Sequence, residues 1–529
     1  MSIKRLAGET AIYGLSSILG RLANFLLLTP FLTRVVPNAE YGVINDLFFY
    51  TAFCIALLVF RLDTAVFRFA SRGDYDPEQV FKTAQGAVMG FALTFTVLGI
   101  GLSGWLADLL QYPDRQLYVQ IVVLIVAFDA LAAVPLARLR LRQRAWTFAT
   151  INLINIGLSI GLVFFTLYFA PKWALAWYDE KWIIAYYFGA LLAASVVRYL
   201  LLVGDGWTNK RKEDKLRSER LDEGETNPAT RSSRPRARIG IFEEYSDLRK
   251  YKKEKIDLPK IDLSKLVRYS APLVVVALAG IVNSLVGPTM IKSWHGGTVS
   301  MNLDWSAQYA AATKMAVFIS LFVQAYNYAA EPFFFRQSGD DLARADRQIF
   351  ADAARAYMLL ASLATAGILL LLPWLEGFVG INKRAGFHLL PQLLAANVLL
   401  GLYYNFAMAY KLTDRTYLGG IIAVAGSAVV VAGNIILVPK IGIDGSAWSI
   451  LSCFVLMSTL AYGVTRRYFP IPYRIDKMML YAALAGGAVY FGTGFENMVV
   501  RVGVLVVLTL VVFFLERAWA HRIFGGSKD

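Results

Sequence analysis

The stretch TAIYGLSSILGRLANFLLLTPFLTRV, residues 10–35, decides the class of this protein. It is a nearly continuous apolar run, long enough for an α-helix to cross the roughly 30 Å hydrocarbon core of a bilayer. Lys4 and Arg5 precede it. The run is too long for the core of a signal peptide and has no small-residue cleavage site. We therefore predict a first transmembrane helix that follows a cytoplasmic N-terminus.

Similar apolar runs recur along the whole chain and set its fold class. The composition agrees, because 57% of the 529 residues are hydrophobic and only 17% are charged, and the mean hydropathy is +0.50. These values exclude a secreted small domain, a coiled coil, a disordered scaffold or an ordinary soluble enzyme. We predict an all-α polytopic membrane protein with about 14 transmembrane helices. The further spans lie near residues 42–67, 84–107, 117–137, 147–169, 182–203, 267–292, 306–334, 350–373, 387–410, 417–437, 444–465, 478–493 and 499–516.

The distribution of positive charge fixes the expected orientation. Lys and Arg are concentrated in every second connection, for example at residues 138–144 and at Arg466 and Arg467. Connections rich in Lys and Arg stay in the cytoplasm, so both termini are predicted to be cytoplasmic. The same rule accounts for the net charge of +15, and we predict no nucleic-acid partner.

One long charged connection divides the chain into lobes. We predict an N-lobe at residues 1–204 with six helices and a C-lobe at 266–466 with six more, followed by two helices and a cytoplasmic tail at 467–529. The linker, residues 205–265, has a low-complexity middle that is predicted to be disordered. Its last part is basic and amphipathic, which suits binding to membrane lipids or to a biosynthetic enzyme. The alternative is a solvated tether. Pseudo-symmetric six-helix lobes favour a transporter with its substrate site between them.

Cationic and amide side chains inside the spans are the candidate substrate ligands. Arg21 and Asn24 share one face of the first span, with Arg21 near mid-depth, where a long side chain reaches neither interface well. Arg61 lies in the second span, and Lys314 and Gln324 lie in the eighth. Cations that face a central cavity favour an anionic substrate, and Arg and Lys both suit phosphate.

Acidic residues in the spans are candidates for ion coupling or for counter-ions. They are Asp63, Asp129 and Glu331. Each also has a purely structural interpretation, because an intramembrane carboxylate can simply neutralise a nearby arginine. Arg68 and Arg138 are expected to extend to the inner interface in the same structural way.

No cofactor is predicted from the sequence. The two cysteines lie in different apolar runs and the three histidines are scattered, so no metal-binding cluster is expected. The phosphate-binding motif GxxxxGK[ST] and the glycine-rich dinucleotide motif do not occur. Any transport would then be driven by an ion gradient (Na⁺ or H⁺), by the membrane potential or by consumption of the product.

Two pairs of segments resemble a known superfamily. SSILGRLANFLLLTPFLTRVVPNAEYGVIND (residues 16–46) and RLDTAVFRFASR (61–72) resemble the start of polysaccharide flippases of the multidrug/oligosaccharidyl-lipid/polysaccharide (MOP) exporter superfamily. LVRYSAPLVVVALAGIVNS (266–284) and QYAAATKMAVFISLFVQAYNYAAEPFFFR (308–336) resemble the opening of that family's second lobe. The nearest group is the Wzx-type O-antigen and exopolysaccharide flippases. This sequence departs from the pattern at Arg61, where a small residue is usual, and in its large charged insert.

The resemblance implies a function and a location. It implies two six-helix lobes with two further helices, and transfer of an undecaprenyl-pyrophosphate-linked oligosaccharide to the outer leaflet of the bacterial cytoplasmic membrane by alternating access. In that setting Arg21 and Lys314 match positions where the family carries cavity charge. The resemblance implies a transporter in lipopolysaccharide or polysaccharide biosynthesis and not an enzyme.

Three rival functions stay open at this point. A lipid II flippase would also be expected to carry cationic substrate ligands in its first lobe. A multidrug cation antiporter of the same superfamily usually has twelve spans and acidic cavity residues. A membrane glycan polymerase or ligase typically carries a large outer loop with catalytic residues, and no predicted outer loop here is that long.

Overall fold

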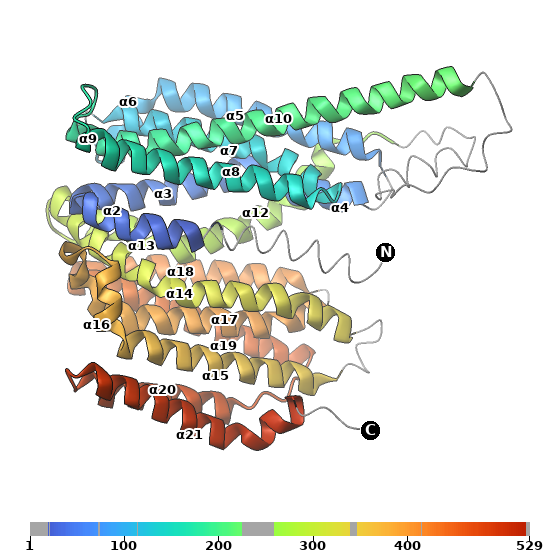
Figure 1. Ribbon diagram of the computed structural model, residues 1–529. Helices are drawn as coiled ribbons and strands as arrows, with labels where there is room; N and C mark the ends of the chain where they lie inside the picture. Colours follow the sequence, from blue (N-terminus) through green and yellow to red (C-terminus); the bar gives the residue numbers. More distant parts are fainter. Residues whose placement is uncertain are drawn as a thin grey trace. The chain divides into compact units, whose positions relative to one another are not determined.

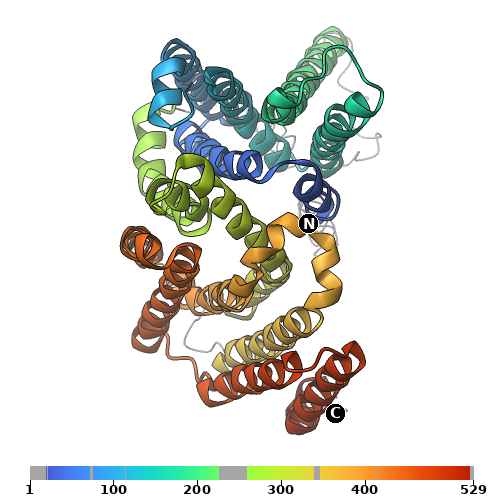
Figure 2. The ribbon, with the colours of Figure 1, turned by 90° about the vertical axis from the view of Figure 1, so that its left-hand side faces the viewer.

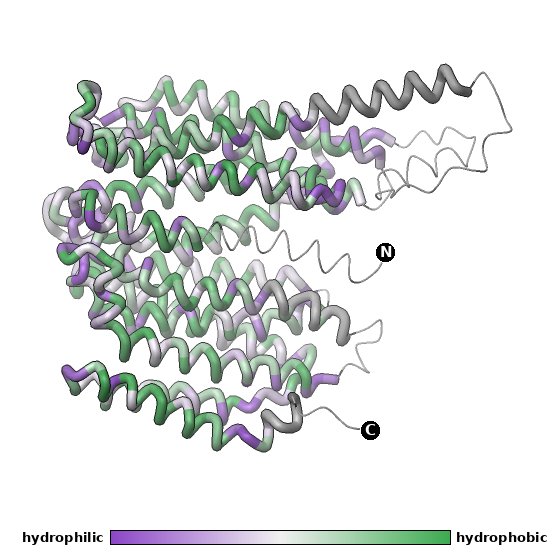
Figure 3. Tube along the Cα trace, in the orientation of Figure 1, coloured by the Kyte–Doolittle hydropathy of each residue, from purple (hydrophilic) through white to green (hydrophobic). Residues whose placement is uncertain are grey.

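The structure is a computed structural model, and it describes residue 20 and residues 22–71, 75–113, 115–224, 259–338, 346–413 and 415–524. All regular elements in these ranges are helices. Twelve of them are long and apolar enough to cross a membrane. The first span, described from residue 22 onward, and helix α20 (Ile475–Thr493) complete the fourteen predicted spans. The protein is therefore a multi-pass, all-α membrane protein, and Figure 3 shows the apolar residues spread along the lengths of its helices.

Two compact units divide the chain. The first comprises residues 1–24 and 50–278, and the second comprises residues 25–49 and 279–529. Two helices pass from one unit into the other: α3 (Asn38–Val59) between Phe49 and Tyr50, and α12 (Leu263–Leu285) between Leu278 and Ala279. The lobe boundaries expected from the sequence stay a prediction.

The first unit is built around α7. Helix α7 (Gln116–Leu141) packs against α5 and α10 and is buried along much of its length. The other helices of this unit are α4 (Leu62–Ser71), α5 (Pro77–Gly101), α6 (Ser103–Leu109), α8 (Ala145–Phe164), the π-helix η2 (Phe165–Phe169), α9 (Ala170–Lys172), the 3₁₀ turn η3 (Glu180–Trp182) and α10 (Ile183–Gly224). Figure 1 shows α10 extending beyond the other helices of the unit. The helix thus continues into the predicted linker, whose low-complexity middle lies outside the described residues.

The second unit is built around α17. Helix α17 (Leu390–Leu412) packs against α14, α15 and α19, and α18 packs against α19. This unit holds α2 (Thr29–Val35), α13 (Gly287–Trp294), α14 (Val299–Ser338), α15 (Arg347–Leu370), α16 (Leu372–Leu375), the 3₁₀ turns η4 (Glu376–Phe378) and η5 (Ile381–Leu389), α18 (Thr416–Ile441), α19 (Ile443–Tyr468), α20 and α21 (Met498–Phe524). Figure 2 shows α20 and α21 at the edge of the unit next to α15.

Two of the predicted spans are each divided into two helices. The second span is interrupted between α3 and α4, where Phe60 and Arg61 have φ values of 49° and 53°. Positive φ is uncommon for residues other than glycine and ends the regular helix. The predicted span 267–292 is interrupted at Val286, and the new helix α13 starts with Gly287 and Pro288. Proline has no amide proton, so it favours the start of a helix over its interior.

Helices α18 and α19 approach each other closely at Gly445. A Cβ atom on Gly445 would lie 2.6 Å from the Leu437 carbonyl carbon and 2.7 Å from the Val438 nitrogen. Gly445→Ala is therefore expected to lower the free energy of unfolding by about 1–3 kcal/mol, because backbone atoms cannot move aside as a side chain can. Gly463→Ala on the same helix is the control, since a Cβ there meets nothing within 4 Å. Thermal unfolding of the two variants in detergent measures the difference, and equal melting temperatures would contradict the prediction.

Candidate functional site

Lys314 lies on an incompletely covered part of α14. Its neighbours Ala312, Met315 and Ala316 are fully buried, whereas Lys314 and, one turn later, Phe318 are only half-buried. Among the residues that the structure describes, no carboxylate and no hydrogen-bond acceptor contacts the Lys314 ammonium. A lysine charge inside a membrane span is costly unless it meets water or an anion. The structure thus leaves Lys314 as a predicted ligand for a negatively charged group.

Aromatic rings flank the lysine on the same side of the helix. Phe318 meets Phe25 edge-on with 4.7 Å between ring centroids, and Phe25 stacks on Phe378 at 5.0 Å. Phe318 lies one helical turn from Lys314, so this aromatic cluster begins on the same face of α14 as the lysine. Gln324, further along α14, is half-buried. Glu331 belongs to the same helix, but its side chain lies outside the described part.

The predicted ligands of the first lobe are only partly described. Arg21 lies outside the described residues. Asn24 is exposed and begins the π-helix η1 (Asn24–Leu28), a rare form of helix that often occurs at functional sites. Arg61 is exposed in the break between α3 and α4, and its carbonyl accepts a hydrogen bond from the Ser270 hydroxyl at 3.3 Å. Asp63 follows in the first turn of α4, half-buried. The ligand roles of Arg21, Asn24 and Arg61 stay predictions, as does the coupling or counter-ion role of Asp63.

Asp129 has a specific partner in the first unit. Its Oδ1 accepts a hydrogen bond from Arg198 at 2.6 Å, and both side chains are largely buried. The pair connects α7 to α10, so it neutralises two intramembrane charges and fixes the two helices against each other. Sequence analysis singled out the aspartate but not its arginine, which lies 69 residues away.

Three buried charged residues of the second unit were not singled out in the sequence. Lys292 on α13 and Asp46 on α3 form an ion pair at 2.6 Å with 2% and 0% of their side chains exposed. Lys383 in η5 is also buried, and its ammonium donates to the carbonyls of Val36 at 2.7 Å and Thr33 at 3.0 Å. Asp46 lies near the start of the predicted span 42–67, and Lys292 is the last residue of the span 267–292. Lys383 lies in the connection between the spans 350–373 and 387–410. In the sequence all three therefore resemble ordinary interfacial residues.

An open cavity of about 800 Å³ adjoins Lys383. Its wall is mostly polar and includes three cationic side chains and one carboxylate, all from the second unit. Arg34 is held by the carbonyls of Pro30 and Gly377, and Arg384 by that of Val379. These cations are thus already engaged by the protein. The lining residues are Thr33, Arg34, Val35, Val36, Pro37, Asn38, Asp304, Val379, Gly380, Ile381, Asn382, Lys383 and Arg384.

Metal chemistry finds no support in the described part of the chain. There, no group of three or more His, Cys, Asp or Glu residues is arranged to hold a metal ion. Cys54 is half-buried and Cys453 is buried, and both are free thiols.

Comparison with known proteins defines the fold. No protein-family model matches the sequence, and no curated protein matches it. The structure is similar to that of the lipid II flippase MurJ in an inward closed conformation, with a TM-score of 0.67 and 10% identity over 96% of this chain and 99% of that one. An inward-facing multidrug resistance MATE family transporter of the MOP superfamily gives a TM-score of 0.55 and 13% identity over 92% and 96%. A MATE protein in the bent conformation gives 0.52 and 14% over 90% and 95%.

These similarities extend over nearly the whole of each chain. The protein therefore has the fold of MOP-superfamily flippases and transporters, as the sequence resemblance implies. At 10–14% identity the comparisons bear on the fold alone. The choice among substrates has to be argued from the side chains.

Proposed function

We propose that this chain, which folds like the MOP-superfamily transporters, is a flippase for a lipid-linked oligosaccharide. The substrate is an undecaprenyl-pyrophosphate-linked repeat unit of an O-antigen or exopolysaccharide. It would move from the inner to the outer leaflet of the bacterial cytoplasmic membrane by alternating access, with both termini of the protein in the cytoplasm.

The observation that carries the proposal is the cation on the half-buried face of α14. Lys314 has no counter-ion among the described residues, which leaves its charge available to the pyrophosphate. Arg21, Asn24, Arg61 and Gln324 are the further proposed ligands. Arg is well suited to this role because its guanidinium donates two parallel hydrogen bonds to phosphate oxygens.

The physical task of such a flippase is to move charge and sugars past hydrocarbon. A pyrophosphate cannot cross the bilayer core unaided, because an unpaired charge is very costly there. A wet cavity with fixed cations supplies the opposite charge, and the glycan stays hydrated in the same cavity. The prenyl tail stays in the lipid. An ion gradient or the membrane potential would drive the cycle, with Asp63, Asp129 and Glu331 as candidate coupling or counter-ion residues.

The second candidate is a lipid II-type flippase. It is favoured by the structural similarity to a lipid II flippase, which has a higher TM-score than either MATE structure compared above. Both candidates share the pyrophosphate and the prenyl chain, so the described side chains suit both. We prefer an O-antigen or exopolysaccharide substrate because segments 16–46 and 308–336 resemble those of polysaccharide flippases. A multidrug cation transporter is disfavoured because a cation would be repelled by Lys314.

Reconstitution into liposomes tests the proposal. Protein would be incorporated with a fluorescent undecaprenyl-pyrophosphate oligosaccharide, and access of an external glycan-modifying enzyme would be followed over time. We expect faster access than in protein-free liposomes, competition by an unlabelled pyrophosphate-linked glycan, and little competition by the same glycan on a monophosphate. Stronger competition by lipid II would favour the second candidate. Uptake of organic cations without glycan movement would overturn both.

A further inference from the structure

Helix α3 belongs to both compact units. Residues 38–49 group with the second unit, and the same uninterrupted helix continues in the first unit from Tyr50. Helix α2 and this half of α3, residues 29–49, are called the docked segment below. The docked segment follows the π-helix η1 on one side, and α3 ends on the other side at the positive-φ break of Phe60 and Arg61. Irregularities of this kind are where helices bend.

A buried ion pair holds the docked segment to the rest of its unit. Asp46 on α3 contacts Lys292 on α13 at 2.6 Å, and neither side chain is exposed by more than 2%. The carbonyl of Lys292 accepts a hydrogen bond from Asn302 on α14 at 2.9 Å. This pair therefore links three helices. A buried ion pair contributes little net stability compared with apolar packing, but it selects one arrangement sharply.

Backbone contacts and polar groups complete the attachment. A Cβ on Gly42 would lie 2.3 Å from the Leu303 carbonyl oxygen, and one on Gly380 would lie 2.1 Å from that of Thr33. The amide of Gly380 donates to the Thr33 hydroxyl at 3.1 Å. The segment also buries large apolar side chains, among them Tyr41, Ile44 and Leu47, each no more than 2% exposed.

Three side-chain hydrogen bonds to backbone carbonyls lie at the turn between α2 and α3. Asn38 donates to the carbonyl of Asn382 at 3.2 Å. The Lys383 ammonium caps the carbonyls at the C-terminal end of α2, where a cation interacts favourably with the helix dipole. All of these groups bind water equally well once they separate, so release of the segment leaves no unsatisfied polar group.

We propose that the docked segment is a releasable latch, closed in this structure by the Asp46–Lys292 pair and the Lys383 cap. The proposal rests on the proposed transport function, because alternating access requires one side of the protein to open. Release would separate residues 29–49 from α13, α14 and η5, with bending at η1 and at the Phe60–Arg61 break. The positive-inside rule places this end of the second unit on the outer side of the membrane.

Cysteine cross-linking tests the latch without a glycan. In a Cys54→Ser, Cys453→Ser background, Leu303→Cys reports on release, because Leu303 is 5% exposed and lies beneath Gly42. A hydrophilic maleimide, present on both sides of proteoliposomes, should label the introduced thiol slowly through brief openings. Cross-linking Asn38→Cys to Asn382→Cys with a short, reducible bis-thiosulfonate, before maleimide addition, should lower the labelling rate by about tenfold or more, since only opened molecules react. Reduction should restore it.

A second cross-link within the same unit is the matched control. His388→Cys and Asp444→Cys replace an exposed pair whose side chains lie 3.2 Å apart, and neither residue belongs to the docked segment. This cross-link should leave the labelling rate of the Leu303→Cys thiol unchanged. Equal labelling with and without the Asn38–Asn382 cross-link, or labelling that the control cross-link blocks as strongly, would overturn the latch. Cross-link-sensitive labelling in a protein that moves no glycan would support the latch and contradict the proposed function.

Discussion

Replacing Lys314 with glutamine is expected to slow translocation of the lipid-linked glycan on the order of a hundredfold, the effect of losing a charge-assisted contact worth about 3 kcal/mol. Glutamine keeps most of the length of the side chain and its hydrogen-bonding capacity, so the change removes mainly the charge. Lys314→Arg should retain much of the activity, because arginine also binds phosphate. The liposome assay measures all three proteins at equal amounts of folded protein.

A lysine elsewhere on the second unit provides the control for this prediction. Lys440→Gln removes the same charge from the exposed end of α18, and its translocation rate should equal that of the wild type. Thermal unfolding should show Lys314→Gln to be at least as stable as the wild type, because a buried lysine without a counter-ion is destabilising. A folded Lys314→Gln protein with an unchanged rate would contradict the site assignment and leave the fold-based proposal standing.

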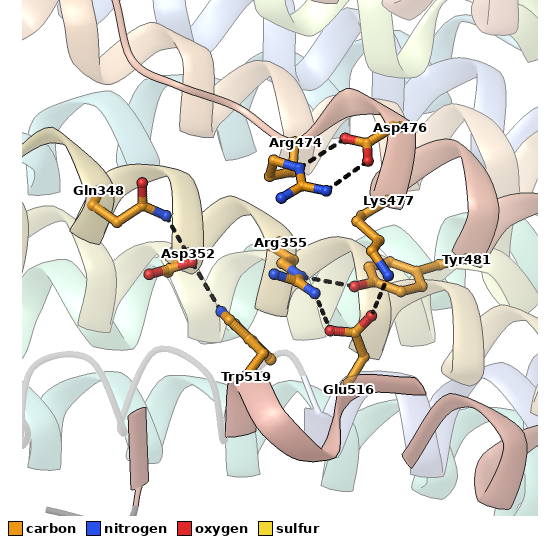
Figure 4. Close-up of polar contacts among 9 residues, drawn as sticks. All are labelled: Gln348, Asp352, Arg355, Arg474, Asp476, Lys477, Tyr481, Glu516 and Trp519. Atoms are coloured by element: carbon orange, nitrogen blue, oxygen red, sulfur yellow. Dashed lines mark hydrogen bonds and ion pairs between the residues drawn. The ribbon is translucent and has the colours of Figure 1, made fainter. Parts of the chain in front are cut away.

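Replacing Glu516 with alanine is expected to lower the free energy of unfolding by about 3–5 kcal/mol, because it leaves a buried arginine without its counter-ion. Figure 4 shows the Glu516 carboxylate between Arg355 and Lys477. The Nε of Arg355 donates to the Tyr481 hydroxyl at 2.9 Å, and its guanidinium lies over the Trp519 ring at 4.6 Å. Glu516 and Arg355 side chains are only 3% and 10% exposed. The network connects α15, α20 and α21.

Two further variants show whether the effect comes from the buried charge. Asp476→Ala removes an exposed carboxylate that pairs with Arg474 in the same region, and it should change stability little. Combining Arg355→Met with Glu516→Leu should recover much of the loss, since an apolar pair can replace a buried ion pair. Chemical or thermal unfolding in detergent measures each protein. A Glu516→Ala protein no less stable than Asp476→Ala would show that α21 is held by apolar packing alone.

The helices could be predicted from the sequence because hydropathy is a local property. Each apolar run of sufficient length must bury its backbone polar groups in a helix, wherever it lies in the bilayer. The breaks at Phe60–Arg61 and Val286 were not predicted, although Arg61 and Asp63 interrupt the apolar run at the first break and Gly287-Pro288 follows the second. The division of α3 between the two units could not be predicted either, because no local sequence pattern shows which helices α3 packs against.

The charged residues inside the spans could likewise be predicted only in part. Lys314 was recognised because its position within a long apolar run is unusual by itself. Lys292 and Asp46 are 246 residues apart, and their pairing depends on tertiary structure that a single sequence does not contain. The same holds for Asp129 and Arg198. An intramembrane charge can thus be noticed in the sequence, but its partner has to be found in the structure.

The network around Glu516 also bears on how the protein is made. Arg355 is synthesised 161 residues before Glu516, and Lys477 is synthesised 39 residues before it. Until α21 has been synthesised, α15 therefore carries a cation that lacks its buried carboxylate, and the second unit cannot reach the packing seen here. Chains truncated before residue 516 should be recognised and degraded by membrane quality-control proteases, which a pulse-chase comparison with full-length chains would reveal. The buried carboxylate of Glu516 thus makes the packing of α15 depend on the presence of α21.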